Sequence, residues 1–406
     1  PQTPNPKPQT PNPKPLYIKI SRERVEIINI KDMIPPCKDI DHQIYKRVDS
    51  ASEADGLAWV FKNAKEFVPY YFKFPELKAD EVRAKVLHTG LCHSDSMTGR
   101  ECWGPCSFPL CAGHEVIAQV TQVGADVKNV KVGQVVGYGP LRKACFECKY
   151  CKKGENNLCC GLPVPERLLY GQYFGGYATH IQQPACHAIP IPAGMDITTA
   201  PPLLCAGATV FSPMQRFIKD KSAKVGVIGI GGLGHLAVQF GHAMGNYVAG
   251  FTTSKDKVDY IKKLGADEVI VIDKEGKEFA NHQDKFDFLV NTLPVSSPEL
   301  LEGYMSTLTS NGTLIQVGAP DINTKMAFSF MLLIMKQIKV VGSAVGSTEE
   351  TAHMLQFAHD HHVKVEAEKF SFEDFPKALD RLENGRPQFR CVVNVEDYNK
   401  QHFPSK

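Results

Sequence analysis

The sequence has no apolar run approaching the ~18 residues that a membrane-spanning helix needs, since its longest candidate covers only residues 326–335. It also has no excess of one charge: 46 basic side chains stand against 44 acidic ones, which leaves a net charge of +2. This balance argues against a general attraction to nucleic acid or to a membrane surface. The amino terminus lacks the basic, apolar and small-residue order of a secretion signal, so we expect a cytoplasmic protein.

Thirteen cysteines stand out against these absences. An odd number of cysteines in a chain of 406 residues without a secretion signal argues against a disulfide framework. Metal ligation, a reactive thiol and plain burial remain, and burial is the default for any single cysteine. Their spacing has to decide between these explanations.

The composition, with 43% hydrophobic residues, suits two or three folded domains rather than a disordered chain. Residues 1–15 repeat PQTPNPK in tandem, which neither helix nor sheet accommodates. We expect five regions: a proline-rich disordered tail at 1–15, an extension without assignable function at 16–54, a mostly β domain at 55–205, an alternating α/β domain at 206–343, and a return to the first domain at 344–406.

The two domains differ in the length and spacing of their apolar runs. Short runs divided by glycine and proline predict the strands of the first domain, at 82–87, 116–123, 134–138 and 187–191. In the second domain apolar runs alternate with helical stretches, and Ser297-Pro298 is a helix-start signal. Strands are expected there at 224–230, 247–251, 269–272, 286–290, 313–317 and 338–341. The fold class is therefore α/β, with a doubly wound parallel sheet beside a mostly β domain.

A glycine-rich loop follows the first strand of the α/β domain. Its six residues open a helix and form a GxGxxG pattern: Gly229, Ile230, Gly231, Gly232, Leu233 and Gly234. The glycines permit a tight turn, close approach to a pyrophosphate and close helix packing, and the helix amino terminus offers N–H groups. The alternative, a purely structural turn, is much less favoured in this context.

The end of the second strand bears on which dinucleotide binds. NAD-binding proteins carry an acidic residue there, whereas this chain has Thr252, followed by Thr253, Ser254, Lys255 and Lys257. Hydroxyl and ammonium groups suit the 2′-phosphate of NADP(H), which a carboxylate would repel. Asp256, between the two lysines, is the one residue here whose negative charge would not favour a phosphate.

Four cysteines lie within a short stretch, at Cys145, Cys148, Cys151 and Cys159. Four thiolates at this spacing suit a closed, tetrahedral, structural zinc site. Cys160 could replace Cys159 as the fourth ligand, although the spacing favours Cys159. A zinc ribbon that contacts nucleic acid would instead need two separated CxxC pairs.

Further motifs stand in an informative order around these cysteines: GLCHSD at 90–95, a stretch ending in GHE at 113–115, Gly175-Gly176-Tyr177, Leu204-Cys205-Ala206-Gly207, and VGSAVGS at 341–347. With the four-cysteine stretch and the glycine loop, they show that the chain, from about residue 55 to 398, resembles zinc-dependent medium-chain alcohol dehydrogenases. Within that family it resembles the cinnamyl alcohol dehydrogenase branch. The resemblance implies a GroES-like catalytic domain at 55–205 and a Rossmann NADP-binding domain at 206–343.

The resemblance also implies residue roles. A catalytic zinc would be held by Cys92, His114 and Cys205, leaving one position for water or substrate oxygen. Asp95 and Glu115 match acids that orient ligands and tune the metal, and Ser94 matches the hydroxyl that begins a proton relay. His93 and Arg390 match contacts to the cofactor pyrophosphate. Two zinc ions per subunit, NADP(H), a small alcohol or aldehyde substrate and a homodimer formed through the Rossmann domain are expected.

The chain departs from the family at Met97, where relatives commonly carry a histidine that passes the proton to solvent. Methionine cannot relay a proton. Trp103 is interpreted either as a wall of the substrate pocket or as a packing anchor. Cys102, Cys106 and Cys111 are expected to be buried or to line the pocket, rather than to form another metal or redox site.

Two alternatives to an NADP-dependent aldehyde reductase stay open. One is an NAD-linked dehydrogenase of the polyol type, which would normally carry an acidic residue in place of Thr252. The other is an inactive, zinc-stabilised binding protein on the same scaffold, since fold alone does not prove activity. The substrate is expected to be an aryl or medium-chain aldehyde or alcohol.

Overall fold

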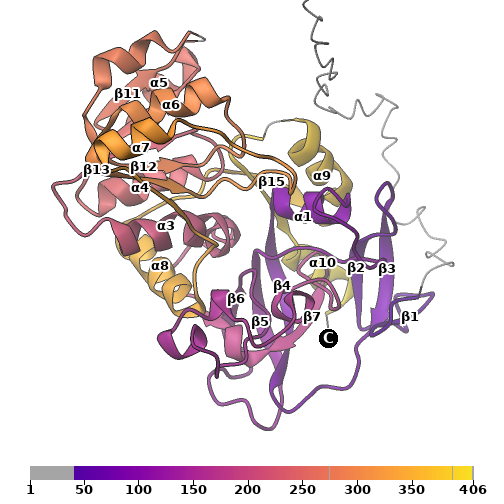
Figure 1. The fold of residues 1–406 in the computed structure, drawn as a ribbon. Helices are drawn as coiled ribbons and strands as arrows, with labels where there is room; N and C mark the ends of the chain where they lie inside the picture. Colours follow the sequence, from indigo (N-terminus) through magenta and orange to yellow (C-terminus); the bar gives the residue numbers. More distant parts are fainter. Residues whose placement is uncertain (1–40, 274, 386, 405–406) are drawn as a thin grey trace, which may run out of the picture. The chain divides into compact units, whose positions relative to one another are not determined.

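Two large sheets of different connectivity organise the chain (Figure 1). The computed structural model describes residues 41–273, 275–385 and 387–404, all of which belong to one compact unit. The predicted tail and residues 16–40 of the extension lie outside the described residues. None of the helices in the described ranges combines the length and the apolar character needed to cross a bilayer.

The first large sheet is the predicted doubly wound parallel sheet. Its strand order, β11-β10-β9-β12-β13-β14, is that of a Rossmann fold, in which the order reverses next to the first strand. The strands are β9 (Lys224–Ile228), β10 (Tyr247–Thr252), β11 (Glu268–Val271), β12 (Phe286–Asn291), β13 (Leu308–Gln316) and β14 (Lys339–Gly342).

Helices pack on both faces of this sheet because its central strands are apolar on both sides. Val225 and Val227 of β9 pack in one core with Phe240, whereas Ile228 packs in another core with Leu301. The helices are α3 (Ala206–Phe217), α4 (Gly234–Ala243), α5 (Val258–Lys263), α6 (Pro298–Ser306), α7 (Phe330–Lys336) and α8 (Thr348–Asp360). The α/β class is thereby confirmed.

The second large sheet is mainly antiparallel and carries the predicted β domain. Its order is β15-β16-β4-β5-β6-β8, and β7 also pairs with β4. Its strands are β4 (Glu81–Leu91), β5 (Val116–Val123), β6 (Val135–Tyr138), β7 (His180–Pro184), β8 (Ile189–Pro190), β15 (Ala367–Ser371) and β16 (Arg390–Asn394). Because β16 pairs with β4, the carboxyl-terminal segment adds a strand to this sheet.

Smaller elements complete the described chain. A three-stranded sheet has the order β1-β3-β2, with β1 (Lys46–Arg47), β2 (Gly56–Phe61) and β3 (Phe67–Lys73). The remaining α-helices are α1 (His93–Gly99), α2 (Val164–Arg167), α9 (Phe375–Asn384) and α10 (Glu396–His402).

Some predicted boundaries need correction. The expected strand at 187–191 is only β8, because His187 instead ends a short 3₁₀ turn and bonds Thr348 Oγ1 through Nδ1 at 2.6 Å. The strand expected at 224–230 ends at Ile228, since Gly229 has a φ of 83°. The helix start at Ser297 is confirmed: its side chain accepts a hydrogen bond from the Leu300 N–H at 3.2 Å.

Candidate active site

Three segments that are distant in sequence bring Cys92, His114 and Cys205 together. Cys92 follows β4, His114 precedes β5, and Cys205 immediately precedes α3. Together with the Glu115 carboxylate, their donor atoms all lie within 4.8 Å of one another, and all four side chains are buried. The structure therefore assembles the three ligands that the resemblance implied and adds Glu115 to the same group.

Asp95 contacts two of these donor residues and holds them in place through hydrogen bonds. Its Oδ1 lies 2.7 Å from His114 Nδ1 and accepts the Gly113 N–H at 3.0 Å. Its Oδ2 accepts the Cys92 N–H at 3.1 Å and the Tyr177 hydroxyl at 2.9 Å. Asp95 is fully buried, so these contacts fix the backbone of one donor and the ring of another.

The orientation of His114 follows from that contact. Its other nitrogen, Nε2, points to Cys205 Sγ at 3.1 Å. Burial lowers the pKa of His114, but the nearby Asp95 carboxylate outweighs it, so the pKa lies well above the usual value. The pKa of the Cys92 thiol shifts in the opposite direction: its contact with Cys205 lowers it well below the usual value.

Glu115 forms a buried ion pair with Arg390, whose Nη2 donates to Glu115 Oε1. Burial raises the pKa of Glu115 to about 7, against the lowering effect of the Arg390 guanidinium. The second carboxylate oxygen, Oε2, is buried and has no hydrogen-bond partner among the described residues. A Cβ on Gly90 would collide with this oxygen, so glycine at position 90 leaves room for the carboxylate.

The donor chemistry fits zinc. Two thiols and an imidazole are the donors of catalytic zinc sites that keep one position open, and here they converge from buried positions. The unpartnered Glu115 oxygen is a further donor beside them. An ion held by these residues would also give this buried oxygen a partner.

The four predicted structural ligands, Cys145, Cys148, Cys151 and Cys159, form a second group with donor atoms within 4.8 Å. Cys159 Sγ lies 3.5 Å from Cys145 Sγ, whereas Cys160 is exposed and outside the group. Four sulfur atoms with no other donor suit a closed, structural zinc site. Within the described residues these two groups are the only clusters of this kind, so Cys102, Cys106 and Cys111 form no third one.

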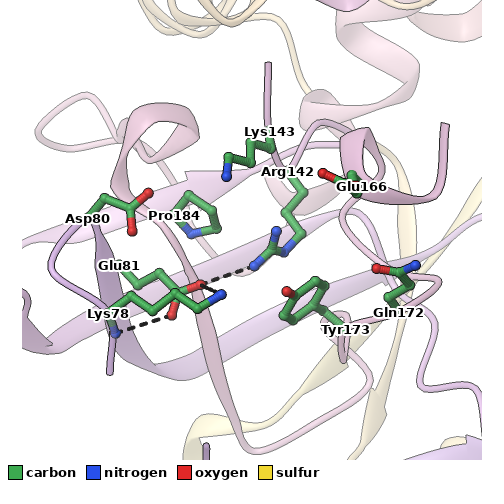
Figure 2. A pocket seen from close by; sticks show the side chains of 9 residues that line it. All are labelled: Lys78, Asp80, Glu81, Arg142, Lys143, Glu166, Gln172, Tyr173 and Pro184. Atoms are coloured by element: carbon green, nitrogen blue, oxygen red, sulfur yellow. Dashed lines mark hydrogen bonds and ion pairs between the residues drawn. The ribbon is translucent and has the colours of Figure 1, made fainter. Parts of the chain in front are cut away.

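A charged surface cavity of about 330 Å³ lies beside the segment that leads into the four-cysteine group (Figure 2). Arg142 Nη2 donates to Glu81 Oε1 at 3.1 Å, and its guanidinium carbon lies 3.3 Å from the centre of the Tyr173 ring. The backbone N–H of Arg142 also donates to the backbone carbonyl of Arg167 at 2.7 Å. The cavity shares no lining residue with either cysteine group, so we interpret Arg142 as an anchor for this segment.

The predicted dinucleotide loop has the expected local structure. Gly229 follows β9 and has a positive φ, and α4 begins at Gly234, where a Cβ would collide with the Gly229 carbonyl. A Cβ at Gly231 would meet nothing within 4 Å, which leaves open space in front of the loop. A Cβ at Gly232 would lie 3.0 Å from Arg390 Cδ. Arg390 thus connects the glycine loop with the Glu115 carboxylate.

The residues predicted to bind a 2′-phosphate lie next to this loop. Thr252 ends β10 and is buried, with its Oγ1 accepting the Ser254 N–H at 3.1 Å. Thr253, Lys255 and Lys257 are exposed. Lys257 Nζ donates to the Ile230 carbonyl of the glycine loop at 3.2 Å. Asp256 is exposed and makes no ion pair among the described residues.

The predicted proton-relay and pocket residues lie around α1. Ser94 is half-buried, with Oγ 3.6 Å from Cys92 Sγ, and His93 is exposed. Met97 is on the same helix and is half-buried. Trp103 Nε1 donates to the Pro320 carbonyl, just after β13, at 3.2 Å, a contact that supports the packing-anchor interpretation.

Tyr177 also belongs to this site, although its motif Gly175-Gly176-Tyr177 predicted no specific role for it. Its hydroxyl bonds Asp95, and a Cβ on Gly176 would press on Val116. An aromatic residue with a polar group after two glycines was the available signal. The pairing of Glu115 with Arg390 had no sequence signal, because the two residues are 275 positions apart.

Comparisons with known proteins agree with this geometry. The alcohol dehydrogenase GroES-like domain family matches residues 78–193, and the zinc-binding dehydrogenase family matches residues 232–360. The chain is 38% identical to the aldehyde reductase AdhA of Synechocystis sp., over 80% of this chain and 94% of that protein. It is 36% identical to cinnamyl alcohol dehydrogenase 8 of Arabidopsis thaliana, over 84% and 95%.

Solved structures give the same result. A cinnamyl alcohol dehydrogenase of Sorghum bicolor superposes with a TM-score of 0.78 at 30% identity, over 84% of this chain and 97% of that one. The Helicobacter pylori cinnamyl alcohol dehydrogenase, solved with NADP(H), superposes with a TM-score of 0.75 at 28% identity, over 84% and 98%.

Proposed function

Since the chain belongs to the zinc-containing medium-chain alcohol dehydrogenase family, in its cinnamyl alcohol dehydrogenase-like branch, we propose that it is an NADP(H)-dependent aldehyde reductase. The observation that carries this proposal is the position of Arg390. It pairs with Glu115 in the buried Cys92, His114 and Cys205 group and lies against Gly232 of the glycine loop. The metal donors and the dinucleotide loop thus meet at one side chain.

The residues divide the chemical work between them. A zinc ion bound to Cys92, His114 and Cys205 would supply Lewis acidity to the substrate oxygen, and a bound nicotinamide would supply or accept the hydride. Asp95 keeps the His114 ring in the orientation that presents Nε2. Two thiolates formally neutralise the ion and limit how strongly it holds an anionic oxygen.

Proton transfer to and from the substrate oxygen is assigned to a side-chain hydroxyl group. The Ser94 hydroxyl, next to Cys92 Sγ, would give a proton to the substrate oxygen during reduction and take it back during oxidation. Met97 cannot continue a relay from α1. We therefore expect water to complete the exchange with solvent at half-buried Ser94.

Cofactor preference rests on Thr252 through Lys257. The second strand of the Rossmann sheet ends without a buried carboxylate, and two exposed lysines follow it. These groups favour the 2′-phosphate of NADP(H). The NADP(H) complex of the H. pylori relative supports the same choice.

The substrate class is an aryl or medium-chain aldehyde, with the corresponding alcohol as product. The relatives named cinnamyl alcohol dehydrogenase and aldehyde reductase support this choice. The cytoplasmic location expected from the sequence stays a prediction.

A homodimer formed through the Rossmann domain is part of the proposal. Helix α7 exposes Phe330, Met331, Ile334 and Met335, each at least 60% accessible. Beside it, β14 is the open edge of the parallel sheet, with Val340 also exposed. An apolar face next to an unpaired strand edge suits a second copy of this chain.

The test combines turnover with metal analysis. The purified protein is assayed with benzaldehyde, cinnamaldehyde, hexanal and sorbitol, each with both nicotinamide cofactors, and its zinc content is measured. We expect aldehyde reduction that favours NADPH and two zinc ions per chain. Sorbitol oxidation with NAD would support the polyol alternative, and zinc binding without any turnover would support the inactive scaffold.

Two serine variants assign the zinc ions to their sites. Cys92→Ser is expected to lose one zinc and the activity while it keeps most of the stability. Cys145→Ser is expected to lose the other zinc together with stability. Loss of activity only in Cys145→Ser would contradict the catalytic assignment.

A further inference from the structure

Phe389 has an unusual backbone conformation for a large aromatic residue. It precedes β16 and has a φ of 70°, in the left-handed region that favours glycine. Such a conformation persists only where the surrounding structure over-determines it, and it is found disproportionately at functional sites. Phe389 is directly followed by Arg390, which links the glycine loop with Glu115.

The Phe389 ring stacks against two aromatic rings of the Rossmann domain. Its centre is 5.0 Å from that of His235, at an interplanar angle of 28°, and 4.9 Å from that of Tyr260, at 16°. His235 is in the first turn of α4, directly after the glycine loop, and Tyr260 is in α5. A residue that directly precedes β16 thus packs against aromatic side chains of α4 and α5.

Phe389 also lies near a residue predicted to select the cofactor. Lys257 Nζ lies 5.9 Å from the centre of the Phe389 ring while it donates to the Ile230 carbonyl. An ammonium at that distance from an aromatic face is attracted to the ring. The Phe389 carbonyl, in turn, is 2.9 Å from where a Cβ of Gly232 would be. Phe389 therefore touches both the glycine loop and the lysine beside it.

The loop that carries Phe389 is fixed from its other side. The Gln388 N–H bonds Glu368 Oε1 at 2.7 Å, and Glu368 forms a two-bond ion pair with Arg381 of α9. His235 is fully buried, and burial lowers its pKa to about 3, so a neutral ring faces Phe389. No charge repulsion with Lys257 or Arg390 disturbs the stack.

We propose that Phe389 is a positioning residue that pins the Arg390 segment to the cofactor domain and orients Lys257 toward the 2′-phosphate of NADP(H). This inference rests on the proposed function, because it assigns a role in cofactor selection within the same site. Without the ring, Lys257 can adopt other rotamers, and Arg390 is no longer held beside Gly232. Binding of NADPH should suffer more than binding of NADH, which has no 2′-phosphate.

The test uses two substitutions that separate positioning from backbone strain. Phe389→Gly and Phe389→Ala both remove the ring, but only glycine relieves the positive φ, so Phe389→Gly should be the more stable variant. Dissociation constants of the zinc-loaded protein for NADPH and NADH are measured by nicotinamide fluorescence. We expect the Kd for NADPH to rise about tenfold in both variants, equivalent to about 1.4 kcal/mol, and the Kd for NADH to rise less. Phe389→Tyr should stay within twofold of the wild type.

A second substitution tests the connection to Lys257. If Phe389 acts through that side chain, Phe389→Ala should add little to the loss of NADPH binding caused by Lys257→Ala, because coupled residues are not additive. If the two losses of NADPH binding add up, Phe389 does not orient Lys257, and the proposal is overturned. If Phe389→Ala and Phe389→Gly fail to fold, Tyr260→Ala removes one half-buried face of the stack and should raise the Kd for NADPH about threefold.

The outcomes distinguish this inference from the proposed function. If the wild type binds neither NADPH nor NADH, the proposed function fails before Phe389 is tested. If the wild type binds NADPH and both ring-deleted variants bind it within twofold of the same Kd, Phe389 only fills space and the inference is overturned. A loss that follows thermal stability, large in Phe389→Ala and absent in Phe389→Gly, would also overturn it.

Discussion

Asp95 Oδ1 lies 2.7 Å from His114 Nδ1, with both side chains buried. The same carboxylate accepts the Cys92 N–H, so one acid positions two of the three proposed catalytic zinc ligands. A carboxylate behind a histidine ligand sets the ring orientation and raises its basicity. Asp95 should therefore control metal affinity without contacting the metal.

Asp95→Asn should weaken zinc binding at the catalytic group about 10- to 100-fold, because an amide neither carries the charge nor accepts all four hydrogen bonds. The four-cysteine group should keep its zinc. Competition with a chromophoric chelator measures both affinities, and exposed Asp126→Asn is the matched control. Zinc affinity equal to that of the wild type at both groups would refute the role of Asp95.

Glu115→Gln should destabilise the protein because it leaves the buried Arg390 guanidinium without its charged partner. Breaking one side of a buried ion pair typically costs about 3–5 kcal/mol. Denaturant unfolding at pH 8, above the raised pKa of Glu115, measures the loss. The double variant Glu115→Gln, Arg390→Met should recover part of it, and a double variant less stable than Glu115→Gln would contradict the explanation.

Met97→His should change the pH dependence of turnover. An unperturbed imidazole titrates at about pH 6.5, so in the direction of alcohol oxidation a histidine at this half-buried position would add a proton acceptor between Ser94 and solvent and speed turnover above that pH. Met97→Leu, which cannot carry a proton, is the control. The kcat profiles of the three proteins provide the comparison, and identical profiles would exclude a relay through position 97.

Ile334→Glu on α7 should convert the proposed dimer to a monomer. The charge would be placed in an apolar face that is expected to be dry in the dimer, where an unpaired carboxylate is costly. Ile322→Glu is the matched control, because Ile322 is equally exposed but lies outside α7. Sedimentation equilibrium gives the mass of each; a monomeric wild type would disprove the dimer.

Local patterns in the sequence were sufficient for the elements whose ligands or turns lie close together in the chain. The four-cysteine group spans a few turns, and the glycine loop joins one strand to the next helix. In such segments the spacing of residues largely sets their spatial relationship, so thiols at short intervals and glycines at a turn already indicate their chemistry. The alternation of strands and helices likewise predicted the parallel sheet.

The short strand β8 shows where local patterns fail. An apolar run with prolines looked like a strand from 187, but His187 forms a hydrogen bond with Thr348, which is distant in sequence. No periodicity within the run reports that partner.

Tertiary structure alone decided how the site is connected. Glu115 meets Arg390 only because β16 pairs with β4, and Phe389 reaches His235 and Tyr260 only because the carboxyl-terminal segment returns to the first domain. The sequence by itself determined which residues offer metal-binding and phosphate-binding groups, since donor type and local spacing are properties of the chain. Strand order and crossovers determined which of them touch, because contacts between distant segments depend on the arrangement of the sheets.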